Sequence, residues 1–159
     1  MKPNQVSCGD VPSMKEPTGI SRSDGKRPDG TTLIPWKRGR MLLWDATVVD
    51  TFATSYIKKT SMNAGSAAKL VENKKVQKYQ SLLSEYYFVP VAIETGGSWG
   101  KDGLRFVKEI GQRITTSTGD QRATSFLIQR ISIAIQRGNA ISIVGTLPQG
   151  KSLDDIMYF

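Results

Sequence analysis

The stretch Lys26–Asp50, KRPDGTTLIPWKRGRMLLWDATVVD, decides how this chain is expected to fold. Apolar, aromatic and β-branched residues in 31–36 and 40–49 predict two strands, joined by a turn at 37–39 whose last residue, Gly39, takes the left-handed conformation. Two acids, Asp29 and Asp45, lie in this otherwise apolar hairpin. A buried carboxylate costs free energy unless another group compensates its charge. The two acids therefore need an explanation.

Strand geometry brings these acids together. In a three-residue loop centred on Arg38, Asp29 faces Thr47, and Asp45 lies one diagonal step away on the same side of the sheet. Two carboxylates that close repel each other, which raises a carboxylate pKa. A divalent cation relieves this repulsion, and Mg²⁺ favours sites with one or two carboxylates. The alternative is that Asp29 is a turn residue of the sequence PDG and Asp45 a strand-end acid.

The rest of the chain predicts a domain over 26–147, between a disordered leader or linker at 1–25 and a loose tail at 148–159. Within the domain, a helix, a strand and two further helices are expected in this order: 64–85, 86–95, 101–118 and a helix capped by Asp120. Pro90 indicates an edge or a bulge in its strand, because proline cannot donate to a ladder. This order predicts an α/β domain, or an α+β one, with a small mixed sheet and flanking helices.

One face of the first helix carries chemistry. Glu72, Lys75 and Tyr79 are spaced three and four residues apart, so they share a face. A lysine beside a metal-bound phosphate can neutralise developing charge or orient a water nucleophile. The alternative for a lysine-rich helix face is that it is simply solvated.

Composition limits the function classes. Lys and Arg number 22 against 14 Asp and Glu, and the net charge of +8 favours a polyanionic partner such as nucleic acid. The chain has no histidine, which excludes histidine-based nucleases, Ser-His-Asp hydrolases and most zinc sites. A single cysteine, Cys8, allows no internal disulfide and indicates a reducing compartment. No apolar run is long enough for a membrane helix, so we expect an intracellular protein that does not enter a membrane.

Several short motifs, taken together and in order, resemble a known family. The sequences RPD, WDATVV and NKKVQKYQSL resemble the restriction-enzyme-like endonuclease domain at the C-terminus of site-specific non-LTR retrotransposon polyproteins, within the PD-(D/E)xK nuclease superfamily. The sequences EPTGISRSDGKRPDGTTLIPW, VPVAIETGGSWG and LIQRISIAIQRGNA also resemble the C-terminal segment of reverse-transcriptase-like proteins that are multicopy in invertebrate genomes. The resemblance runs from about Glu16 to Leu147. It implies a restriction-endonuclease-like fold and a chain that is the end of a longer polyprotein.

The resemblance also implies residue roles. Asp29 matches the first acid and Asp45 the second, both as ligands of Mg²⁺ or Mn²⁺. The superfamily's lysine lies two residues after the second acid, where this chain has Thr47; Lys75 with Tyr79 matches the retrotransposon branch best. Supporting or alternative roles fall to four further residues: Lys78, then Lys74, as replacements for Lys75; Arg27 as a phosphate contact; and Glu94 as a supporting acid or a mere strand-end residue.

The function implied is a metal-dependent DNA endonuclease that hydrolyses phosphodiester bonds in the nucleus, with RNA or a reverse-transcriptase domain of the parent polyprotein as further partners. Arg122, Arg130 and Arg137 on the later helices would follow the phosphate backbone. Two alternatives stay open: a non-catalytic basic nucleic-acid-binding module, and an inactive retroelement remnant. The chain departs from the family in lacking a helix before the first acidic strand.

Overall fold

A five-stranded mixed sheet forms the centre of the computed structural model, which describes residues 5–8, 11–20 and 27–146. The strands are adjacent in chain order: β1 (Gln5–Cys8), β2 (Val11–Lys15), β3 (Gly30–Thr32), β4 (Leu42–Val49) and β5 (Tyr87–Glu94). The first four pair antiparallel, and β5 runs parallel to β4. The predicted α/β class with a mixed sheet is confirmed.

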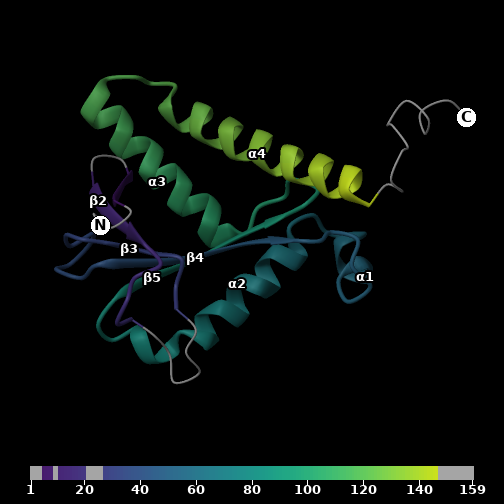
Figure 1. The fold of residues 1–159 in the computed structure, drawn as a ribbon, viewed down its shortest axis with the longest axis horizontal. Helices are drawn as coiled ribbons and strands as arrows, with labels where there is room; N and C mark the ends of the chain where they lie inside the picture. Colours follow the sequence, from purple (N-terminus) through teal and green to yellow (C-terminus); the bar gives the residue numbers. More distant parts are fainter. Residues whose placement is uncertain (1–4, 9–10, 21–26, 147–159) are drawn as a thin grey trace, which may run out of the picture.

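Helices cover both faces of the sheet (Figure 1). A short α1 (Ile57–Thr60) leads to α2 (Ser66–Lys78) on one face, and a 3₁₀ turn, Gln80–Leu82, follows α2. The long helices α3 (Lys101–Thr118) and α4 (Ala123–Gly145) lie on the opposite face. Among the described residues, no helix has the length and apolar character needed to cross a membrane.

Alternation along β4 divides the core between the two faces. Leu43 packs with Tyr79 and Phe88 on the α2 side. Leu42 packs with Trp36 and Phe106 on the α3 side. Asp45 is two residues after Leu43, so it belongs to the α2 face together with Thr47.

The hairpin register differs from the prediction and places the two acids directly opposite each other. Gly30 pairs with Trp44 and Thr31 with Leu43, so the next pair in this register is Asp29 and Asp45. The predicted partner of Asp29, Thr47, was wrong by two residues, which keeps every side chain on its predicted face.

The reason for this shift lies between β3 and the turn. β3 ends at Thr32, whose hydroxyl accepts the N–H of Leu42 at 3.0 Å in place of a ladder bond. The predicted strand 31–36 therefore leaves the ladder early. The turn itself has two central residues, not three: Arg38 and Gly39, at φ 50° and 72°.

Four other expected elements need correction. The 1–25 segment contains strands β1 and β2, which its density of Pro and Gly concealed, while 1–4, 9–10, 21–26 and the tail at 147–159 lie outside the described residues. The helix predicted to reach 85 ends at Lys78. The segment 50–61, for which no element was predicted, contains α1. Asp120 precedes the α4 cap residue, Arg122, and accepts its N–H at 2.9 Å.

Pro90 fits without a bulge because β5 is the edge strand of the sheet, as the sequence allowed. It pairs with Asp45 of β4, which is the one strand that borders β5 in the described part of the sheet. Its missing N–H therefore removes no bond to a second strand.

Gly30 keeps the strand of Asp29 close to β4. A Cβ at position 30 would overlap the indole ring of Trp44. We expect Gly30→Ala to lower the free energy of unfolding by about 1–3 kcal/mol, the usual cost of overpacking, measured by urea denaturation.

Gly138, in the interior of α4, is the matched control. A Cβ there meets nothing within 4 Å, so Gly138→Ala is expected to stabilise the fold by about 0.5–1 kcal/mol through helix propensity. Equal denaturation midpoints for Gly30→Ala and the wild type would contradict the close contact with Trp44.

Candidate active site

The two acids of the hairpin meet at the surface of the α2 face. Asp29 immediately precedes β3, and its Oδ2 accepts the backbone N–H of Ala46 at 2.6 Å. This bond ties the carboxyl group of Asp29 to the strand that carries Asp45. Asp29 is exposed as a residue, whereas Asp45 is only 6% exposed. The pair therefore has one solvent-facing and one buried member.

Lys75 of α2 compensates the buried acid. Its Nζ lies 2.7 Å from Asp45 Oδ2, and both side chains are almost fully covered. Asp45 Oδ2 has no hydrogen-bond partner of good geometry among the described residues, so this ion pair supplies its compensation. A buried charge without such a partner would be strongly destabilising.

The neighbouring lysines of α2 point elsewhere. Lys74 Nζ lies over the ring of Tyr56 at 5.9 Å, and Lys78 Nζ lies over the ring of Tyr79 at 5.0 Å. Of the three candidate lysines, Lys75 is therefore the one that the structure brings to the acids.

Tyr79 contacts the backbone just before Asp29. It is fully buried one helical turn after Lys75, and its hydroxyl donates to the carbonyl of Arg27 at 3.1 Å. Arg27 lies two residues before Asp29, so Tyr79 positions the segment that carries the first acid. The guanidinium of Arg27 points outward and pairs with Glu16 at 2.7 Å.

Thr47 lies beside the cluster without joining it. The residue is half-buried, and its hydroxyl donates to the carbonyl of Ala46 at 2.8 Å. A hydroxyl at position 47 offers no positive charge to the acids. Lys75 supplies the charge from the helix instead.

The electrostatics of the pair raise the pKa of Asp29 above its ordinary value of 3.8. Loss of solvation against β4 is the largest cause, and the charge of Asp45 together with hydrogen bonding to it raises the pKa further. The N–H of Ala46 and the charge of Lys75 act in the opposite direction. The carboxylates of Asp29 and Asp45 repel each other, and the positive charge of Lys75 acts on both.

Glu94 lies away from the acids. It is 1% exposed, and its Oε1 accepts the N–H groups of Ala67 and Ala68 at the start of α2. It is four residues further along β5 than the partner of Asp45, roughly 13 Å at the usual rise of a strand. Of the two roles considered for Glu94, this placement favours the structural one, as a cap for the helix that carries Lys75.

Glu72 has a comparable role that the sequence did not reveal. Its buried carboxylate accepts the N–H groups of Asp102 and Gly103 at the start of α3. Loss of solvation raises the pKa of Glu72, although these two hydrogen bonds oppose that shift. Spacing placed Glu72 on the face of Lys75, but no local signal links it to α3.

The three arginines proposed for the phosphate backbone are not brought to the acids. Arg130 and Arg137 project from α4, and Arg122 precedes it, on the opposite face of the sheet from α2 (Figure 1). All three are exposed, and Arg122 lies 3.7 Å from Asp120.

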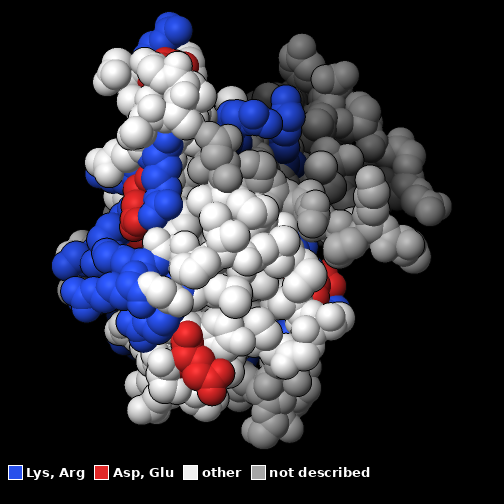
Figure 2. Space-filling model, turned by 90° about the vertical axis from the view of Figure 1, so that its left-hand side faces the viewer, with Lys and Arg blue, Asp and Glu red and all other residues white. Residues whose placement is uncertain are grey.

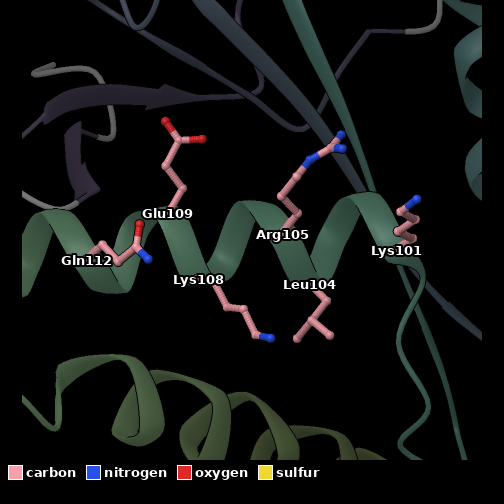
Figure 3. Close-up of a pocket in the computed structure, with 6 residues that line it drawn as sticks. All are labelled: Lys101, Leu104, Arg105, Lys108, Glu109 and Gln112. Atoms are coloured by element: carbon pink, nitrogen blue, oxygen red, sulfur yellow. The ribbon is translucent and has the colours of Figure 1, made fainter.

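A hollow of about 710 Å³ runs along α3 and is likewise remote from the acids. Figure 3 shows its lining residues spread around the helix, with Glu109 and Arg105 pointing toward the strands and Lys108 and Leu104 toward α4. They do not converge on a common point, and the hollow contains no acid pair.

The donor set at the acids fits a hard divalent cation. Asp29 and Asp45 provide two carboxylates, of which Asp45 is paired with Lys75, and Asp29 is open to solvent. Two acids with one lysine leave a net negative charge when both acids are ionised. No cluster of three or more His, Cys, Asp or Glu side chains able to hold a metal occurs in the described part of the chain. Two carboxylates completed by water and substrate oxygens are the arrangement that Mg²⁺ accepts.

Removing one charge of the pair tests this account of the electrostatics. A raised pKa means that the folded state holds the proton of Asp29 more tightly than the unfolded chain does, so stability falls as pH rises from 3.8 through the raised pKa. Asp29→Asn keeps an oxygen for the N–H of Ala46 and removes the repulsion. Its melting temperature at pH 7, without divalent ions, is expected to exceed that of the wild type.

The advantage of Asp29→Asn should shrink as the pH is lowered toward 3.8, where the wild-type carboxyl group is protonated. Asp50→Asn is the control, because Asp50 is exposed and accepts the N–H of Phe52, which an asparagine can do as well. A lower melting temperature for Asp29→Asn at pH 7 would contradict the repulsion.

A second variant separates the two roles considered for Glu94. Glu94→Ala leaves two N–H groups at the start of α2 without their acceptor, and the expected loss is about 2 kcal/mol of unfolding free energy. Glu94→Gln, which keeps the oxygen, should lose less. If instead Glu94→Gln removed a metal-induced rise in melting temperature while leaving stability unchanged, Glu94 would be a ligand.

The chain matches no family model, no curated protein and no solved structure. The chemistry open to the acid cluster therefore follows from its own geometry. That geometry consists of two carboxylates, one buried ammonium and a tyrosine that fixes the backbone beside them.

Proposed function

We propose that this domain is a divalent-metal-dependent DNA endonuclease of retroelement origin, with a restriction-endonuclease-like arrangement around Asp29, Asp45 and Lys75. The observation that carries the proposal is the contact of Lys75 Nζ with Asp45 Oδ2 at 2.7 Å, beside a second carboxylate tied to the same strand. The net charge of +8 supports a nucleic-acid substrate. A DNA substrate in turn implies action in the nucleus.

Each residue of the cluster has a distinct task in this proposal. Asp29 and Asp45 would hold Mg²⁺ or Mn²⁺, which, when bound, lowers the pKa of a water and stabilises charge on the phosphate. Lys75 compensates the charge of Asp45 in its buried position and would present a positive charge to the phosphate as it reacts. Tyr79 holds the carbonyl of Arg27, and so keeps Asp29 directed at Asp45.

The raised pKa of Asp29 sets a requirement on pH. Ligation needs the carboxylate, so metal binding is expected to weaken on acidification at a higher pH than an ordinary aspartate would require.

A second function, a non-catalytic DNA-binding module, has one observation in its favour. Lys75 already neutralises Asp45, so the fold keeps its buried acid compensated without a metal. Such a module would bind DNA with a strong dependence on salt and would not require divalent ions for binding.

The experiment that tests the proposal is nicking of supercoiled plasmid with Mg²⁺ or Mn²⁺. Asp45→Asn is expected to lower the rate by at least about a hundredfold, since it removes a ligand and an electrostatic contact to the reacting group. Asp50→Asn, at the end of the same strand and exposed, should cut at the wild-type rate.

The lysines offer a matched pair for the same assay. Lys75→Arg keeps the charge near Asp45, whereas Lys75→Met leaves a buried carboxylate unpaired, at a cost of roughly 3–5 kcal/mol. Lys74→Met, one residue away, is the control for the charge of the helix. A loss of nicking with Lys74→Met and none with Lys75→Met would overturn the assignment.

Metal binding has a readout that does not depend on cleavage. Mg²⁺ should raise the melting temperature of the wild type through binding to the native state, and it should not do so for Asp45→Asn. A folded wild type that neither cuts nor gains stability from Mg²⁺ or Mn²⁺ would favour the binding module.

A further inference from the structure

The tight turn between β3 and β4 concentrates positive charge at one end of the sheet. Lys37, Arg38 and Arg40 occupy three of its four positions, around Gly39. We call Lys37–Arg40 the basic turn. None of these three cations forms an ion pair with a carboxylate among the described residues, in contrast with Arg105 and Arg113 on α3.

The basic turn is held rigidly. Lys37 and Arg40 exchange backbone hydrogen bonds at 3.3 and 3.0 Å, and Trp36 N–H donates to the carbonyl of Arg40 at 2.9 Å. Trp36 itself is buried, with the guanidinium of Arg113 stacked 3.6 Å from its ring centre. The turn thus has fixed backbone supports, which reduces the entropy lost when its side chains bind a partner.

The residue at the tip of the turn, Arg38, has an unfavourable backbone conformation. Arg38 has φ of 50°, a left-handed conformation that L side chains other than Asn, Asp and Gly adopt reluctantly. Two-residue turns with both φ values positive favour the pair Asn-Gly. Here the two central positions hold Arg38 and Gly39. The arginine gives the tip of the turn a positive charge, but it favours the turn conformation less than an asparagine would. Conformational strain of this kind is typical of functional positions.

The basic turn is joined to the acid cluster through one strand. Arg40 precedes Asp45 by five residues of β4 and its approach, roughly 16 Å at the rise of a strand. Arg40 also reaches toward the α2 side, where its guanidinium donates to the carbonyl of Leu83 at 3.1 Å. A fixed separation of this size corresponds to about five base-pair steps at 3.4 Å each.

Figure 2 shows the end of the molecule that lies on the left in Figure 1. Lys and Arg side chains gather along one flank of this face, beside a broad surface of uncharged residues. Charge gathered on one side suits a partner that is itself uniformly charged along its length.

We infer that the basic turn, Lys37–Arg40, is a contact for the phosphate backbone of double-stranded DNA, which it holds over the acid cluster. The inference rests on the proposed function and adds the surface that holds the substrate. The basic turn and the acid cluster are held at a fixed separation by β4 and its approach. A stiff DNA duplex suits this arrangement, because both places would contact the same two positions of the duplex in every complex. The basic turn takes over the task that the sequence had suggested for Arg122, Arg130 and Arg137.

The closing experiment uses a substitution that separates folding from binding. Arg38→Asn installs the preferred Asn-Gly turn and removes one charge, so the melting temperature should rise while DNA affinity falls. Binding to a fluorescent 20-base-pair duplex is measured without divalent ions, between 50 and 200 mM salt. The slope of log K against log salt is expected to decrease by about 0.9 for Arg38→Asn, and by about 1.8 when Lys37→Gln is added.

The matched control removes two charges from α4. Arg130→Gln with Arg137→Gln lowers the net charge as much as the turn double variant does, but on the other face of the sheet, and should leave the slope unchanged. A loss of slope in the α4 variant with none in the turn variant would overturn the inference. So would unchanged binding by Arg38→Asn, or tighter binding of an RNA duplex of the same sequence that the turn variants do not weaken.

The binding assay is independent of cleavage. A reduced slope in the turn variants together with no nicking by the wild type supports the DNA contact and removes the proposed endonuclease. If the wild type nicks the plasmid and the turn variants bind DNA as the wild type does, the endonuclease proposal stands and the DNA contact at the basic turn is overturned.

Discussion

The parallel pairing of β4 with β5 is the constraint on which the rest of the structure depends. Two parallel strands cannot be joined by a tight turn, so the chain between them must cross one face of the sheet. That crossing is α2, and it necessarily lies over the side chains of β4 that point to its face. Asp45 is one of these. Because α2 packs on the face of the sheet to which Asp45 points, Lys75 on α2 can reach Asp45.

Three buried carboxylates show how this fold accommodates negative charge. Asp45 has an ammonium partner, whereas Glu94 and Glu72 accept backbone N–H groups at the starts of α2 and α3. A helix N-terminus offers unpaired donors and a favourable dipole, so it is a natural partner for a carboxylate. Asp29 accepts the N–H of Ala46 and lies beside the charge of Asp45, which already has Lys75 as its partner. The pKa of Asp29, like that of Glu72, is raised, so the fold favours its protonated form.

Much of this arrangement was predictable from local pattern. The α/β class, the β4 and β5 strands, α3 and the shared face of Asp45 and Thr47 follow from periodicity and alternation. The convergence of Asp29 and Asp45 was also predicted, because an error of two residues in register preserves which side a strand residue faces. The alternation of side chains along the strands was therefore enough to place the two acids on one face.

What could not be predicted depends on contacts distant in sequence. The hydroxyl of Thr32 replaces a ladder bond to Leu42 and ends β3 early, which no hydrophobic pattern indicates. The choice among Lys74, Lys75 and Lys78 depends on how α2 is rotated over the sheet. That rotation is fixed by Glu94 at its start and by Tyr79 at its end. Strands β1 and β2 were missed because Pro12 and short length hide their alternation.

The position of β5 late in the chain has a consequence for the order of folding. Asp29, Asp45 and Lys75 all precede β5, but the residue that caps α2, Glu94, is the last of β5. The hairpin can bring the two acids together while β5 is still unpaired, and their repulsion is then uncompensated until α2 docks. Closing such a long-range parallel pair is intrinsically slow. Mild acid, which protonates Asp29 and so removes the repulsion, should therefore accelerate refolding of this domain, whereas the metal binding proposed above requires Asp29 to be ionised.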